Sequence, residues 1–138
     1  MVRLKKLDQE TLGLSSVMER ITHARVLDCF KDNDGIYFIV AAGEMGKALG
    51  KGAMNVKIME REIGKRVRVI EHRERVEDFV RNVIYPLKVE DIVFHEGIVE
   101  IRDNNKKTKS LLIGRDSKNL NFINMTVKRF FSVEVKVV

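Results

Sequence analysis

The sequence predicts an α+β fold in which one helix–strand unit occurs twice. Hydrophobic residues make up 44% and charged residues 33% of the 138 positions, a composition typical of globular domains. The segment around Gly50 has a counterpart 64 residues later around Gly114, and Asn55 matches Asn119 in the same frame. Similar helical and β-rich patterns flank both segments, so a duplication accounts for most of the chain.

The first copy begins with an amphipathic helix. Two β-rich runs in residues 25–41 come next, one on each side of an Asp-Asn-Asp-Gly turn. A helix precedes the glycine segment and another follows it, because Val56, Met59 and Ile63 recur at the spacing of one helical face. Residues 65–71 then alternate like a half-buried strand. The apolar positions that predict the first helix are Leu14, Val17, Met18 and Ile21.

The second copy repeats this order after a short charged boundary at residues 71–75. An amphipathic helix ends before Pro86, and two runs in residues 88–101 surround a His-Glu-Gly turn. A helix over residues 118–130 follows the second glycine segment, and residues 132–138 alternate like a strand. The first of these helices is predicted by Val76, Phe79, Val80, Val83 and Ile84.

Residue spacing excludes several catalytic and cofactor-binding loops. A nucleotide-binding P-loop requires glycine where Met45 stands, and Ser or Thr where Gly52 follows Lys51. A dinucleotide-binding loop requires a third glycine at the position of Asn55. The three histidines are scattered, and Cys29 lies among apolar neighbours as the single cysteine. We therefore expect no enzyme activity, no metal site and no cofactor.

Hydropathy and charge favour a cytoplasmic protein that binds nucleic acid. The longest apolar run, residues 36–42, is far shorter than the roughly 20 residues of a membrane helix, so we expect no membrane contact. Of the net charge of +6, residues 47–68 contribute +5 and residues 105–129 contribute +6, so the rest of the chain is net negative. Positive charge thus coincides with both glycine segments. The alternative is that these charged residues simply form solvated helix faces and bind no ligand.

A helix, a glycine loop and a second helix form the arrangement of KH domains, whose Gly-x-x-Gly loop clamps about four nucleotides by their backbone. Glycines let a sugar-phosphate backbone approach the main chain closely. Free N–H groups at the start of the second helix favour an anion, and Lys51 or Arg115 adds positive charge. This chemistry predicts binding of single-stranded RNA.

In its segments LGKGAMNV, residues 49–56, and IGRDSKNL, residues 113–120, the chain resembles the archaeal NusA family of transcription termination and elongation factors. The resemblance covers essentially the whole chain. It implies two tandem type II KH domains, at residues 1–73 and 74–138, each a three-stranded mixed sheet with helices packed on it. It also implies a transcription factor that binds single-stranded RNA near RNA polymerase.

The resemblance places the RNA contacts in and just after the two glycine loops. Ala53 replaces the last glycine of the first loop, while the second contains Asp116, whose carboxylate would repel phosphate, and Ser117. An alternative role for Asp116 or Ser117 is to cap the helix at 118–130. The expected RNA-binding residues are Gly50, Lys51, Gly52, Ala53, Asn55 and Lys57 in the first copy and Gly114, Arg115, Asp116, Ser117 and Lys118 in the second.

Two other functions are compatible with the same residues. A KH-fold protein of ribosome assembly or translation would use the same chemistry on a different RNA. A KH-derived protein-interaction module that has lost RNA binding would carry acids or bulky residues in both loops, whereas only the second loop contains an acid. The sequence leaves the RNA sequence preference, direct contact with RNA polymerase and the oligomeric state open.

Overall fold

The computed structural model describes residues 9–138, with side chains described from residue 13 onward. The chain divides into two compact units between His72 and Arg73. Each unit has the same order of elements and contains one three-stranded sheet with both parallel and antiparallel pairs. The predicted α+β class is confirmed, and the two mixed sheets with their helices fit a KH-like fold.

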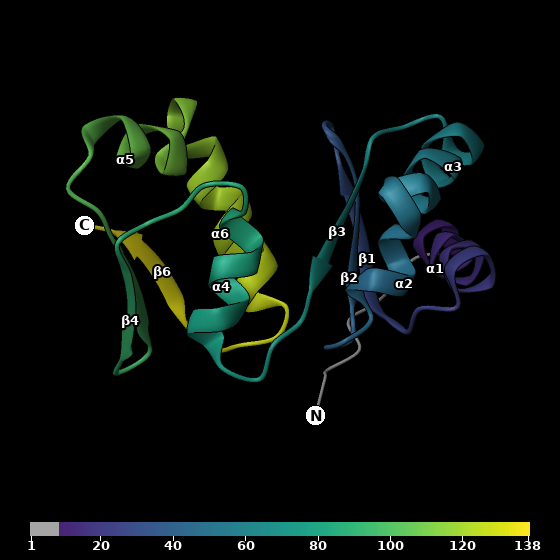
Figure 1. Ribbon diagram of the computed structural model, residues 1–138. Helices are drawn as coiled ribbons and strands as arrows, with labels where there is room; N and C mark the ends of the chain where they lie inside the picture. The colour runs from purple at the N-terminus through teal and green to yellow at the C-terminus, as the bar shows by residue number, and fades with distance from the viewer. Residues whose placement is uncertain (1–8) are drawn as a thin grey trace. The chain divides into compact units, whose positions relative to one another are not determined.

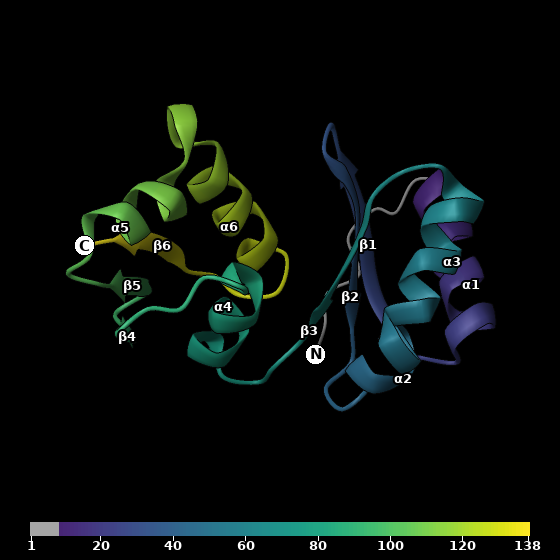
Figure 2. The ribbon, with the colours of Figure 1, turned by 45° about the horizontal axis from the view of Figure 1, so that its top comes forward.

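The first unit has its helices on one side of the sheet (Figures 1 and 2). Strand β2 is central, antiparallel to β1 and parallel to β3. Because β3 lies at the edge next to the central strand, the chain must cross over between them, and the two helices around the glycine segment make that crossover. The elements are α1 (Gln9–Thr22), β1 (Val26–Asp32), β2 (Gly35–Val40), α2 (Met45–Leu49), a 3-10 turn (Lys51–Ala53), α3 (Met54–Ile63) and β3 (Val67–Glu71).

Local chemistry explains the hairpin and the helix face of this unit. The carboxylate of Asp32 accepts hydrogen bonds from the N–H groups of Asp34 at 2.7 Å and Gly35 at 3.1 Å, which closes the turn between β1 and β2. Met59 of α3 is fully buried, and Val56 and Ile63 are partly buried against the same core, so the predicted apolar face is confirmed. The core also includes Met18, Ala24, Cys29, Ile36, Phe38, Val40, Ala48, Val67 and Val69.

The second unit repeats the topology with β5 in the centre, antiparallel to β4 and parallel to β6. Helices α4 and α6 lie side by side over its sheet (Figures 1 and 2). The elements are α4 (Val76–Ile84), β4 (Asp91–His95), β5 (Ile98–Arg102), α5 (Lys106–Ile113), a 3-10 turn (Arg115–Ser117), α6 (Lys118–Lys128) and β6 (Glu134–Val137).

Aromatic packing fixes the end of α6 in the second unit. Phe79 of α4 lies with its ring centroid 5.5 Å from that of Phe130 and 5.7 Å from that of Phe131. The N–H groups of both phenylalanines bond to the carbonyl of Val127, so the helix ends in a tight turn, and α6 stops at Lys128. The helix is therefore shorter than the predicted 118–130. Among the described residues, no helix has the length and apolarity to cross a membrane.

Candidate nucleic-acid interface

The two glycine segments have nearly the same main-chain conformation. Gly50 has φ 70° and ψ 176°, and Gly114 has φ 74° and ψ 173°. Two left-handed residues follow each glycine after one intervening basic residue: Gly52 and Ala53 in the first turn, Asp116 and Ser117 in the second. The repeat noticed in the sequence is thus a repeat of backbone geometry, even where the residues differ.

Gly50 and Gly114 are required by the helix that follows them. A Cβ at Gly50 would lie 2.8 Å from Nδ2 of Asn55, and a Cβ at Gly114 would lie 2.9 Å from the main-chain nitrogen of Asn119. Their φ and ψ values also belong to a region that is essentially restricted to glycine. Gly52 differs, because a Cβ there would meet nothing within 4 Å. Its bare backbone faces open space, as the clamp hypothesis expects.

The paired asparagines hold each turn together. Nδ2 of Asn55 donates to the carbonyl of Lys47 at 2.9 Å, and Nδ2 of Asn119 donates to the carbonyls of Leu111 and Leu112 at 3.0 and 3.1 Å. Each amide thereby satisfies the last carbonyls of one helix from the first turn of the next. Sequence reasoning placed Asn55 among the RNA contacts and missed this bracing role, although the match between Asn55 and Asn119 was visible.

The basic residues of both turns are accessible. Lys51, Lys57, Arg115 and Lys118 are all exposed. Within residues 9–138, neither Lys51 nor Arg115 forms an ion pair. These cations therefore lie at the surface of the two turns. In the first turn the main chain is also accessible, at Gly52.

An ion pair anchors the start of α2 in the first unit. Lys47 lies 3.4 Å from Glu44, and Glu44 also accepts a hydrogen bond from the N–H of Arg25 at 2.9 Å. The hydrogen bond from the Arg25 N–H, and after it the charge and hydrogen bond of Lys47, hold the pKa of the half-buried Glu44 carboxyl below its usual value. Lys47 is thus partly neutralised, which leaves Lys51 as the main cation of the first turn.

The helix-cap hypothesis for the second turn is wrong for Ser117. Ser117 occupies the position before α6 in a left-handed conformation with φ 60°, and its side chain makes no capping hydrogen bond. A capping side chain requires an extended backbone to reach back to the helix N–H groups, and Ser117 lacks it. Ala53 before α3 likewise provides no side-chain cap. Neither residue at the cap position, Ala53 or Ser117, therefore supplies a capping side chain to the helix that follows it.

The structure brings the predicted contacts together in two sets. Gly50 to Ala53 with Asn55 and Lys57 surround the turn between α2 and α3, and Gly114 to Lys118 form the turn between α5 and α6. Two exposed apolar side chains flank the turns: Met54 is 53% exposed and Leu111 is 50% exposed. The sequence analysis did not predict either of them as part of the site. Since unpaired bases stack on apolar surface, these side chains extend the chemistry available beside the turns.

Candidate metal ligands do not gather in the part of the chain that the structure describes. It contains no group of three or more His, Cys, Asp or Glu residues that could hold a metal ion. Cys29 is buried in β1 and forms no disulfide within the described residues. The glycine turns remain the best candidate site.

Comparison with known proteins gives several relatives over most of the chain. The sequence is 30% identical over 137 residues to the probable transcription termination protein NusA of Methanocaldococcus jannaschii, covering 96% of this chain and 75% of that protein. It is 30% identical over 131 residues to the protein of the same name from Halobacterium salinarum, covering 94% of each. The crystal structure of APE1850 superposes with a TM-score of 0.76 at 27% identity, covering 96% of this chain and all 100% of that one. No protein-family model matches the sequence.

Proposed function

The chain belongs to the archaeal NusA family of transcription termination and elongation factors, and from this membership we propose that it binds single-stranded RNA through its two glycine turns. In this proposal residues 1–73 and 74–138 are two type II KH domains, and RNA and RNA polymerase are the partners. The observation that carries the proposal is the matched geometry of the two turns, each with an exposed cation in its centre.

The physical basis is the same in both turns. A Cβ at Gly52 would meet no atom within 4 Å, so the main chain there is open to a phosphate. The phosphate would lie close to Lys51 and to the start of α3, where Ala53 provides no side-chain cap. Main-chain N–H groups and the positive end of a helix dipole both favour an anion there. Arg115 and the start of α6 offer the same groups in the second unit, where the exposed Asp116 opposes them. The first turn is therefore proposed as the stronger site.

A titration against single strands and duplexes tests this function. We expect fluorescent single-stranded RNA to bind more tightly than a duplex of the same length, because a narrow clamp grips one strand and unpaired bases. If about four phosphates are neutralised, log K plotted against log salt should have a slope of roughly −3, at about −0.7 per contact. Equal affinity for the duplex would contradict the proposal.

Identification of the bound RNA separates transcription from translation. Crosslinking in cells followed by sequencing of the attached RNA should recover nascent transcripts if the protein acts on transcription. Recovery of ribosomal RNA alone would instead support the role in ribosome assembly or translation that the same residues permit.

A further inference from the structure

The helix before the glycine turn is longer in the second unit than in the first. α5 has eight residues and α2 has five. At the separation of 64 residues that relates Gly50 to Gly114, α5 begins three residues earlier than α2. The start of α5 carries Lys106, Lys107 and Lys109, where the first unit has Ala42, Gly43 and Met45. The second unit therefore has three cations at positions where the first unit has none.

The three lysines at the start of α5 are accessible to a ligand. Lys106 and Lys107 are exposed, and Lys109 is half-buried. Among the described residues, none of the three forms an ion pair. In the first unit the basic residue of α2 is Lys47, which Glu44 partly neutralises. Positive charge before the turn is thus unopposed in the second unit alone.

The acidic residues just before α5 are bound to main-chain groups of the same loop. Asp103 accepts hydrogen bonds from the N–H groups of Asn105 at 2.7 Å and Glu90 at 3.1 Å. Glu90 in turn accepts from the N–H of Asn104 at 3.2 Å. The side chain of Asn105 then caps the helix by accepting from the N–H of Thr108 at 3.0 Å. These bonds fix the start of α5 without any contribution from the lysines.

Lysines at the start of a helix oppose the dipole of that helix. The N-terminal end carries a partial positive charge, so acidic residues stabilise it and basic residues destabilise it. Helix α4 of the same unit follows this preference, with Glu77 and Asp78 in its first turn. Helix α5 has no acidic residue in its first turn. Cations placed where they cost stability indicate a role outside the fold, and positive charge favours an anionic ligand.

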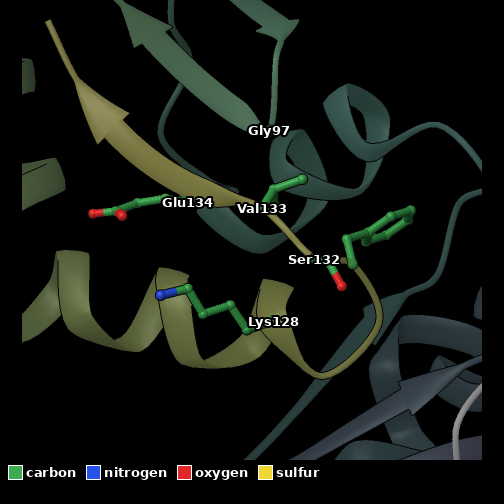
Figure 3. Close-up of a pocket in the computed structure, with 6 residues that line it drawn as sticks. Gly97, Lys128, Ser132, Val133 and Glu134 are labelled. Atoms are coloured by element: carbon green, nitrogen blue, oxygen red, sulfur yellow. The ribbon is translucent and has the colours of Figure 1, made fainter.

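The helix after the second turn offers little positive charge to a ligand. Residues 119–127 of α6 include no charged residue. At the end of α6 lies a hollow of about 450 Å³, and Figure 3 shows Lys128 on one side of it and Glu134 on the other, so a carboxylate balances that cation. In the first unit the equivalent helix α3 carries exposed Lys57 and Arg61 on one face. The two units thus differ in which helix beside the turn is basic.

On the basis of the RNA binding proposed for the two turns, we propose that Lys106, Lys107 and Lys109 form a phosphate-binding surface on α5, which holds the RNA strand beyond the nucleotides at the second turn. At 1.5 Å per residue α5 is about 12 Å long, so these lysines contact other phosphates than Arg115 does. Exposed Leu111 lies between them and the turn and offers apolar surface to a base. The lysines offset the repulsion of Asp116, and the second unit requires a longer strand than the first.

Titration of the full chain with RNA of two lengths tests this surface. The variant is Lys106→Gln with Lys107→Gln, and the single strands have about four nucleotides, the length that one clamp holds, and about three times as many. The variant should bind the long strand about fivefold to tenfold more weakly and the short strand as tightly as the wild type. For the long strand, the slope of log K against log salt should become less steep by about 1.4, which corresponds to two phosphate contacts at about 0.7 each.

Thermal unfolding without RNA distinguishes a ligand-binding role from a structural one. The lysine variant should have a Tm about 1–3 °C above that of the wild type at low salt, because the helix dipole disfavours cations at the start of α5. The matched control is Arg73→Gln with Arg81→Gln, which removes the same charge from exposed positions of the second unit. Arg81 lies in the last turn of α4, where a cation is favourable, so the control should have a slightly lower Tm and nearly unchanged affinity for the long strand.

The outcomes separate the α5 surface from the function on which it rests. Unchanged affinity of the lysine variant for the long strand, or an equal loss in the control, would overturn the α5 surface while leaving RNA binding intact. An equal loss for the short strand would show that the lysines act by general attraction, and a lower Tm would show that they stabilise the helix; either result overturns the surface. Failure of the wild type to bind either strand would overturn the proposed function itself.

Discussion

Gly50 and Gly114 combine two requirements at one position. Each has φ near +70° with an extended ψ, and each lies against the asparagine that braces the turn. Both requirements arise from the protein itself, whether or not RNA is bound. Glycine at these positions is thus explained by the fold, whereas the open surroundings of Gly52 leave its main chain available to a ligand.

Alanine substitutions should separate these roles. We expect Gly50→Ala and Gly114→Ala to lower the free energy of unfolding by about 2 kcal/mol or more, because the added Cβ meets close atoms and the conformation excludes side chains. Gly114→Ala should cost more, since its Cβ would meet main-chain nitrogen, which cannot rotate away. Gly52→Ala is the matched control and should cost about 1 kcal/mol, the penalty of a left-handed residue.

Urea denaturation of the three variants measures these costs. A loss at Gly52 as large as that at Gly114 would contradict the distinction between a packed glycine and an open one. Unchanged stability of Gly114→Ala would show that the turn relaxes around the new side chain.

Asp116 gives a second prediction at the scale of one residue. It occupies the position of Gly52, with φ 54° and an exposed carboxylate close to where a phosphate would bind. Asp116→Gly should strengthen RNA binding several-fold, because screened charges a few ångströms apart interact by about 1 kcal/mol. Fluorescence titration measures the gain, and circular dichroism checks the fold. Weaker binding by a fully folded variant would contradict the repulsive role.

Among the elements, β2 carries a tyrosine whose ionisation is coupled to folding. The Tyr37 hydroxyl donates to Asp32 at 3.1 Å, and its ring stacks on Phe30 with centroids 5.1 Å apart. Burial, then the charge of Asp32 and the hydrogen bond to it, then Asp34, raise the pKa of Tyr37 to about 12, while the charge of Arg68 opposes them. Folding therefore favours the protonated phenol.

This coupling predicts a loss of stability in alkali. A pKa raised on folding gives a contribution that is complete below the ordinary value of 10.0 and disappears as the pH rises through about 12. The free energy of unfolding of the wild type should fall over this interval more steeply than that of Tyr37→Phe, which has no phenol to ionise. Urea denaturation at a series of pH values gives both slopes, and parallel slopes would contradict the coupling.

Hydrophobic periodicity predicted most of the elements because it reports which face is buried. Met18 and Met59 lie in the core where the spacing placed them, and the two runs around each turn became hairpins. Periodicity could not predict the hydrogen bonds that side chains make to main-chain groups far away in the sequence, because it reports only burial. Asn124 fits any exposed helix position by its polarity, and only the fold brings it to Val135. Ser117 looked like a cap by type, but its backbone conformation excludes that role.

For the whole molecule, the charge distribution is the reason that RNA is the proposed partner of the two turns. The net charge of +6 is concentrated in the windows around the turns, while the remainder of the chain is net negative. Attraction of phosphate to these windows depends on salt and is independent of RNA sequence. The two units share this attraction, and the carboxylate of Asp116 makes it unequal.

The most direct test of this account compares RNA binding before and after acids are placed in the first turn. Lys51→Asp combined with Gly52→Asp changes the local charge by −3, and the fold should persist because Asp116 already occupies the equivalent left-handed position. The matched control is Gly13→Asp with Lys88→Asp, which makes the same charge change at exposed residues outside the turns. Arg115→Asp is the comparison in the second turn.

Fluorescence titration of single-stranded RNA, with circular dichroism to confirm folding, is the deciding measurement. The account predicts at least a tenfold loss of affinity for the double variant in the first turn, since each screened charge contributes about 1 kcal/mol. It predicts a smaller loss for Arg115→Asp and a much smaller one for the control. An unchanged affinity in both turn variants would contradict the account and favour a protein-interaction module, and a larger loss from Arg115→Asp would reverse the ranking of the turns.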